Sequence, residues 1–276
     1  SSDDNAATSN SSDTSLISVN NSEPQNGLIP SDTNEMGGGK VIRYLFEGLV
    51  SFDAKGKQHL EVAESITPNE DATKYTIKLK KGWKFTNGEA VTAHSFADTW
   101  SFAANVKNAQ KTSSRFSTIK GYDKLQDGDK LKGDEQLEGL KVVNDHEFTV
   151  DLNRSDSVFA IKVGYTAFAP LPESFFKDPK AFGEKPVGNG PYKFQSWDHD
   201  NQIVLVKNPG SVAGFGEIVE SVLSQRFDSE NLLILHTRQA RFIFDKPVSW
   251  TRDGEAGGEY QDITLKNYEC PVQMIF

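Results

Sequence analysis

The sequence predicts a mixed α/β (α+β) fold, in which helices flank a mixed sheet, and three observations support this prediction. The chain has 276 residues, which is enough for two lobes or subdomains. Hydrophobic residues make up 36% of it and charged residues 25%, with 18 Phe and 4 Trp, a composition typical of globular proteins. Short strand patterns alternate with helical patterns between residues 16 and 209.

Residues 1–15 contain almost no apolar side chains, so ordering them would not be compensated by burial. We expect a flexible leader or tether there. A spacer behind a lipid-anchored N-terminus would have this composition, and a plain disordered tail is the alternative. Because the chain starts at Ser1 rather than Met, we expect a terminus that is processed, with a signal peptide removed, or recloned.

The first folded elements are expected from Leu16 onward. The run LISVN alternates in polarity and predicts a strand, and NSEPQNGLIP predicts a loop. Residues 37–39, three glycines, precede KVIRYLFEGL, whose apolar residues recur at helical spacing. This predicts a glycine-rich turn that opens a helix ending near Gly48. A phosphate-binding loop is the alternative, but Val41 stands where that motif needs Ser or Thr.

Two strand-like runs follow, at residues 75–80 and 83–85. Lys81-Gly82 joins them and Asn87-Gly88 comes after them, which predicts a β-hairpin region.

A helix is expected next, with Thr92 as its N-cap and the sequence AHSFADTWSFAANV. Its Phe96, Trp100 and Ala103 or Ala104 form one apolar stripe. Further on, LKVVNDHEFTVDL at 140–152 predicts a strand, a turn and a strand, and IVLVKNP at 203–209 predicts the end of a last one.

Several function classes lack support in the sequence. The net charge is −9 and basic residues are scattered, so no nucleic-acid partner is expected. No apolar run approaches the roughly 20 residues of a membrane span. We predict no catalytic residue, no metal site and no cofactor, because there is no Gly-x-Ser-x-Gly, His-x-x-x-His or Cys-x-x-Cys pattern. The lone Cys270 excludes an intrachain disulfide.

Five segments taken in order carry a family resemblance: NSEPQNGLIPSDTNE, YLFEGL, HLEVAESITPNEDATKYTIKLKKGWKFTNGEAVTAHSFADTW, NDHEFTVDL and VGNGPYKFQSWDHDNQIVLVKNP. Over about residues 16–209 the chain resembles the extracellular solute-binding proteins of oligopeptide, dipeptide and nickel ABC importers. The resemblance implies a periplasmic-binding-protein-like lobe at 16–209, with a subdomain at about 50–185, and a protein that is not an enzyme.

The resemblance also implies a function. A short peptide or peptide-like ligand would be captured outside the cell, held through main-chain hydrogen bonds and delivered to ABC permease subunits in the membrane. We expect a monomer that is extracellular and lipid-anchored, or periplasmic.

Site residues follow from the resemblance by position. The loop Asn34-Glu35-Met36-Gly37 matches the family segment that faces the cleft, where glycine permits close approach to a ligand. Phe116, Tyr165 and Phe168 match stretches that border the cleft, and ordinary core packing is the alternative for these aromatic residues.

Residues 210–276 lack the family's landmarks, so the second lobe is expected to be truncated or replaced, and this segment completes the lobe or is appended to it. The acidic group that neutralises a peptide's amino terminus in relatives lies in that second lobe and is not transferred to any residue here. A truncated or frameshifted product, a fusion joined at Gly210-Ser211 and a minimal natural variant remain open.

Two alternative functions stay open beside ligand capture. An interaction or scaffold protein derived from a binding-protein lobe would show no ligand-induced closure. A hydrolase that uses a carboxylate pair would turn over peptides or glycosides, although pairs such as Asp134-Glu135 lie in polar, solvated surroundings.

Overall fold

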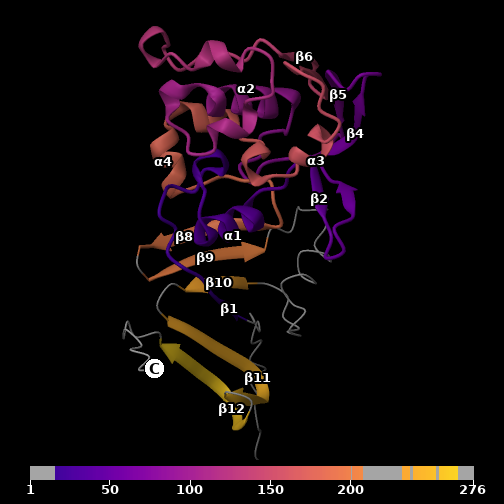
Figure 1. Cartoon of the computed structure of the whole chain (residues 1–276). Coiled ribbons are helices and arrows are strands. Elements are labelled where there is room, and N and C mark those ends of the chain that lie inside the picture. Colours follow the sequence, from indigo (N-terminus) through magenta and orange to yellow (C-terminus); the bar gives the residue numbers. More distant parts are fainter. Residues whose placement is uncertain (1–15, 200, 208–231, 237–238, 253–254, 267–276) are drawn as a thin grey trace, which may run out of the picture.

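The structure, a computed structural model, describes residues 16–199, 201–207, 232–236, 239–252 and 255–266 (Figure 1). For residues 16–20, 206–207 and those beyond 231 the backbone alone is considered. The predicted leader at 1–15, the Gly210-Ser211 junction and Cys270 lie outside the described residues.

Helices and strands alternate along the described chain. The α-helices are α1 Met36–Leu45, α2 Ala93–Ala104, α3 Phe159–Lys162 and α4 Pro179–Glu184. Short 3-10 helices lie at Pro30–Asp32, Val106–Asn108, Ser113–Phe116, Tyr122–Leu125, Gly128–Lys130, Thr166–Phe168 and Glu173–Lys177. The strands are β1 Leu16–Asn20, β2 Val50–Phe52, β3 Gln58–Leu60, β4 Ala63–Pro68, β5 Lys74–Leu79, β6 Leu140–Asn144, β7 Glu147–Asp151, β8 Tyr192–Asp198, β9 Gln202–Lys207, β10 Leu232–His236, β11 Gln239–Arg252 and β12 Glu255–Lys266.

Two four-stranded sheets organise these elements (Figure 1). The first, in the order β4-β5-β7-β6, is antiparallel throughout. The second, in the order β1-β10-β9-β8, is mixed, because β1 runs parallel to β10 while the other pairs are antiparallel. A strand from beyond residue 209 therefore completes the second sheet. Two antiparallel pairs, β2–β3 and β11–β12, complete the described sheet structure.

Each sheet has its own hydrophobic core. The first core lies between the β4-β5-β7-β6 sheet and α2, around the fully buried Trp100, whose indole N–H donates to the Phe168 carbonyl at 2.9 Å. The second core lies between α1 and the strands β8 and β9, and its fully buried members include Val41, Leu45 and Ile203. Apolar burial on this scale is the main favourable term in folding.

Most of the predicted elements are confirmed. The structure has the strand from Leu16, the strand–turn–strand at 140–151 and the strand that ends near residue 207. Thr92 is the N-cap of α2, and its backbone N–H donates to Ser95 Oγ at 3.0 Å. The stripe of Phe96 and Trp100 is buried as predicted.

The predicted hairpin between residues 75–80 and 83–85 is wrong. Strand β5 pairs with β4 on one side and β7 on the other, which leaves it no free edge for residues 83–85. That segment instead forms an isolated bridge, Lys84 to Ala90, across the Asn87-Gly88 turn. Gly88 has φ +90°, a left-handed conformation that favours glycine.

The prediction for α1 needs correction at both ends. The three glycines lie inside the first turns of α1 rather than before it, because the Glu35 carboxylate caps the helix by accepting the Gly38 N–H at 2.8 Å. The helix ends at Leu45 rather than near Gly48, and Phe46 is already extended with φ −124°.

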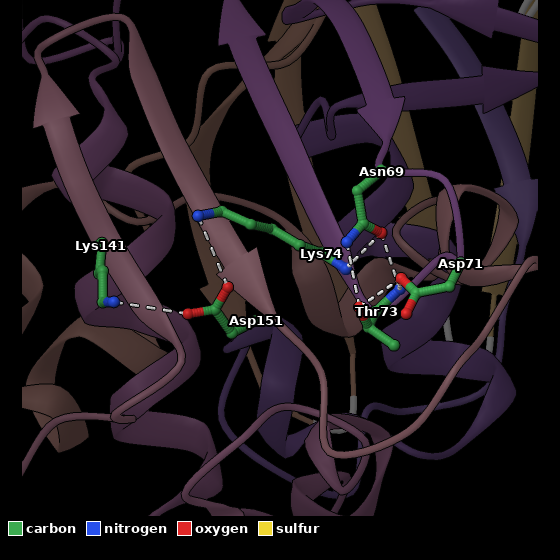
Figure 2. A network of polar contacts seen from close by, with 6 residues as sticks. All are labelled: Asn69, Asp71, Thr73, Lys74, Lys141 and Asp151. Carbon is green, nitrogen blue, oxygen red and sulfur yellow. Dashed lines mark hydrogen bonds and ion pairs between the residues drawn. The ribbon is translucent and has the colours of Figure 1, made fainter.

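A polar network lies on the exposed surface of the first sheet (Figure 2). Asn69 Oδ1 accepts the backbone N–H of Thr73 at 2.9 Å, and Asp71 accepts the Thr73 hydroxyl at 2.6 Å. The Asp151 carboxylate lies 3.9 Å from Lys74 Nζ and 3.5 Å from Lys141 Nζ. Exposed ion pairs contribute about 0–1 kcal/mol each. The bonds of Asn69 and Asp71 to Thr73 therefore fix the turn between β4 and β5.

The described part of the chain contains no helix that is both long and apolar enough to cross a membrane.

Residues Gly188-Asn189-Gly190 make direct backbone contact with the chain that leaves α1. The Gly190 N–H donates to the Leu45 carbonyl at 2.8 Å. The Asn189 side chain accepts the Glu47 N–H at 2.9 Å and donates to the Glu47 carbonyl at 3.0 Å. A Cβ atom at Gly188 would overlap the Leu45 carbonyl oxygen. We call this contact the 188–190 clamp.

We predict that Gly188→Ala lowers the free energy of unfolding by at least about 2–3 kcal/mol, because backbone lies where the new methyl group must go. Gly39→Ala is the matched control, since nothing lies within 4 Å of a Cβ there and alanine is favoured in a helix by about 1 kcal/mol. Urea unfolding checks both variants. Equal stability of the two would contradict the clamp.

Candidate functional site

A cavity of about 540 Å³ lies beside the segment that the clamp holds. Its wall comes from three parts of the chain: α1 from Lys40 on, residues 46–52 with strand β2, and residues 164–169 after α3. The labels α1, β2 and α3 in Figure 1 mark where these three parts of the chain lie. The volume is within the roughly 300–1,000 Å³ typical of small-molecule sites.

The clamp sets the orientation of Glu47 in this wall. Because Asn189 satisfies both backbone polar groups of Glu47, that residue is fixed at a point where the chain is neither helix nor strand. Glu47 is 4% exposed, and its Oε2 atom has no hydrogen-bond partner among the described residues. A buried carboxyl with an unpartnered oxygen is rare in native proteins.

Burial raises the pKa of Glu47 from 4.5 to about 8, and repulsion from Glu61 adds to the effect. Glu61 is itself buried and accepts the Ser51 hydroxyl at 2.6 Å. At neutral pH the Glu47 carboxyl is therefore protonated. It can donate one hydrogen bond, or it can ionise when a positive group arrives.

Tyr165 is the predicted site residue that the structure places in the cavity wall. Its side chain is 45% exposed, and the Arg115 guanidinium lies 4.3 Å from the ring centroid, within cation–π range. The neighbouring Gly164 is needed for packing, since a Cβ there would overlap the Phe52 ring. Strand β2 and the 164–169 turn are thus in direct contact.

Phe116 and Phe168 lie behind this wall, in the first core. Both are fully buried, and their ring centroids are 4.5 Å apart. Each also packs on Trp100: the ring centroids of Phe116 and Phe168 lie 6.3 and 5.1 Å from that of Trp100. Their side chains contact other core aromatics, and Phe168 ends the short helix that starts after Tyr165.

The loop Asn34–Gly37 lies at the other end of α1 from Glu47. Asn34 is exposed and Met36 is 79% exposed, whereas Gly37 is buried against the Ser22 backbone. Glu35 caps α1 as described, and its Oε1 atom also accepts the Gln25 N–H at 3.4 Å. The structure does not bring this loop into the wall of the cavity that holds Tyr165.

Glu47 and Asn189 are the site residues that sequence reasoning missed. The available signal was a single carboxylate inside the apolar run YLFEGLV. Its fixed position depends on Asn189, which lies 142 positions later in the chain.

The pKa of the Glu135 carboxyl is shifted in the opposite direction to that of Glu47. The backbone N–H groups of Lys132 and Gly133 lower the pKa of Glu135 to about 2, so this member of the Asp134-Glu135 pair is ionised at neutral pH. A general acid needs the opposite shift. Within the described ranges, no group of three or more His, Cys, Asp or Glu could hold a metal ion.

Comparison with known proteins identifies relatives. Residues 57–214 match the model of the bacterial extracellular solute-binding proteins, family 5 Middle. The oligopeptide-binding protein OppA of Bacillus subtilis is 31% identical over 185 residues, which are 66% of this chain and 33% of that protein. Periplasmic oligopeptide-binding protein OppA of Salmonella typhimurium is 32% identical over 202 residues, 70% of this chain and 36% of that protein.

A solved structure has the same fold. Haemophilus influenzae OppA in complex with RPPGFSPFR superposes with a TM-score of 0.68 at 26% identity, over 81% of this chain and 42% of that one. The prediction of a mixed α/β, periplasmic-binding-protein-like fold is confirmed. The chain spans about a third of the length of the curated relatives it matches.

We predict that Glu47→Gln removes a pH dependence of stability. The pKa of Glu47 in the folded state lies above the unfolded value of 4.5. The contribution of this carboxyl to the stability of the wild type is therefore complete below pH 4.5 and is lost as the pH rises to about 8. The amide of the variant cannot ionise. Between pH 4.5 and pH 8, the free energy of unfolding of the variant therefore rises by roughly 3–5 kcal/mol relative to that of the wild type.

Urea unfolding at several pH values measures this difference, and Glu64→Gln, on the exposed surface of β4, is the control. A wild-type stability that follows the same pH course as the Gln variant would contradict the raised pKa.

Proposed function

Because the chain belongs to the bacterial extracellular solute-binding proteins, family 5, we propose that it captures oligopeptides or peptide-like solutes outside the cell for an ABC importer. Its named relatives bind oligopeptides, and one of them was solved with a nine-residue peptide. The observation that carries the proposal is the cavity between α1, β2 and the 164–169 turn.

The cavity wall suits an extended main chain. Three consecutive residues of β2 line it, and β2 pairs with one neighbour, β3, among the described strands. The other edge of β2 is therefore available for backbone hydrogen bonds to an added strand. Apolar surface from Val50, Phe52 and Tyr165 would cover ligand side chains without selecting one sequence.

The predicted site residues divide into three roles in this proposal. Tyr165 contacts the ligand, and Phe116 and Phe168 hold the turn that carries Tyr165 in place from the core side. Loop residues Asn34–Gly37 would contact a ligand that extends along α1, with the exposed Met36 as the first contact.

Delivery to ABC permease subunits, attachment to the membrane through a lipid and a monomeric state complete the proposal, and no catalytic step belongs to it. Ligand binding by such a lobe is coupled to closure of a cleft, in which a few hinge residues absorb the motion.

Native mass spectrometry of the gently purified chain tests capture directly. A heterogeneous set of short peptides is the expected result. A bound sugar, haem or metal would contradict it, and a chain that holds no peptide and does not change its hydrodynamic radius with trialanine or trilysine would favour the scaffold alternative.

We predict that Tyr165→Ala weakens binding of trialanine about tenfold, because the ring supplies exposed apolar area in the cavity wall. Tyr165→Phe keeps the ring and should bind within about threefold of the wild type. Val143→Ala, on the 57% exposed Val143 of β6, is the surface control. Isothermal titration calorimetry measures all three, and equal affinity of Tyr165→Ala and wild type would remove Tyr165 from the site.

A further inference from the structure

Two buried side-chain oxygens lack a hydrogen-bond partner in the described part of the chain, Glu23 Oε2 and Glu47 Oε2. The Glu23 carboxylate is otherwise engaged, since its Oε1 atom accepts the Trp197 indole N–H at 2.9 Å. Glu47 differs because it lies in the wall of the cavity. The Oε2 atom itself is covered by protein, so a ligand in the cavity has to displace part of the wall to reach it.

Two polar side chains of this region, Ser51 and Asn189, already have other partners. The Ser51 hydroxyl donates to Glu61 at 2.6 Å, and the Asn189 amide donates to the Glu47 carbonyl rather than to its carboxyl. A buried acceptor without a donor is unfavourable, and a second carboxyl nearby increases the cost of a negative charge. A positively charged donor from outside the chain would offset both penalties, whereas a neutral donor would offset only the first.

We propose that the Glu47 carboxyl binds a cationic group of the ligand, a primary ammonium or a guanidinium, that enters the cavity. This inference rests on the proposed function and specifies the chemistry of its ligand. A cation supplies the missing donor and also offsets the combined negative charge of Glu47 and Glu61, which a neutral donor cannot do.

The other charged and titratable groups of the cavity wall are Lys40, Arg43, Tyr44 and Tyr165. Lys40 and Arg43 are exposed, so solvent and salt screen their repulsion of a cation, whereas Glu47 is shielded from solvent. Burial raises the pKa of Tyr44 to about 12, so Tyr44 stays neutral.

Binding of the cation is coupled to the release of a proton from the Glu47 carboxyl. Glu47 carries a proton below about pH 8 and must release it to pair with a positive group. Between about pH 6 and pH 7, therefore, each bound cation releases about one proton, and the affinity rises about tenfold over that unit. The ligand's ammonium groups stay charged over most of this range.

Titration calorimetry of the full chain with trilysine, in buffers of different ionisation enthalpy, measures the released protons. Ethylammonium chloride presents the charge without a peptide, and sodium chloride at equal ionic strength is its control. Glu47→Gln keeps the size of the side chain and should bind trilysine about 10- to 100-fold more weakly with no proton release. Glu64→Gln should behave as the wild type.

The outcomes separate this inference from the proposed function. Trilysine that binds without proton release, and with equal affinity for Glu47→Gln, overturns the cationic site and keeps peptide capture. Proton release with ethylammonium but no binding of trilysine keeps the cationic site and overturns peptide capture. If trilysine does not bind and no proton is released with either compound, both the cationic site and peptide capture are overturned.

Discussion

Close contact between two backbone segments, Gly188–Gly190 and Leu45–Glu47, is the constraint on which the rest of this structure depends. No side chain larger than hydrogen fits at Gly188 or Gly190, and Asn189 replaces the hydrogen bonds that a strand partner would have supplied. The contact lies beside Val187, which packs against both the core around Trp100 and the core around α1. It also ends α1 at Leu45 and brings the chain from the helix into the cavity wall.

The clamp places a carboxyl where an apolar residue would be favoured. The same chain buries Asp156, but it pairs that carboxylate with Lys162 at 2.6 Å. Glu47 has no such partner among the described residues, and burial, with a smaller contribution from Glu61, raises its pKa to about 8. Local violations of this kind reduce stability and are expected at functional sites. The buried acid and the adjacent cavity therefore mark the same part of the fold.

Elements defined by neighbouring residues could be predicted from the sequence. The Thr92 cap, the apolar stripe of α2 and the alternation that buries Tyr75 and Ile77 in β5 depend on spacing over a few positions. The hairpin at 75–85 failed because the second partner of β5 is β7, some seventy residues later.

The site was less predictable for the same reason. Tyr165 and the loop at 34–37 could be proposed by family resemblance, whereas the position of Glu47 is fixed by Asn189, far along the chain. Carbon-13 NMR of the Glu47 side-chain carboxyl, followed from about pH 4 to pH 10, tests this account most directly. A midpoint near 8 that falls toward 4.5 in Asn189→Ala is the predicted result. A wild-type midpoint near 4.5 would show that the clamp does not hold the acid away from water.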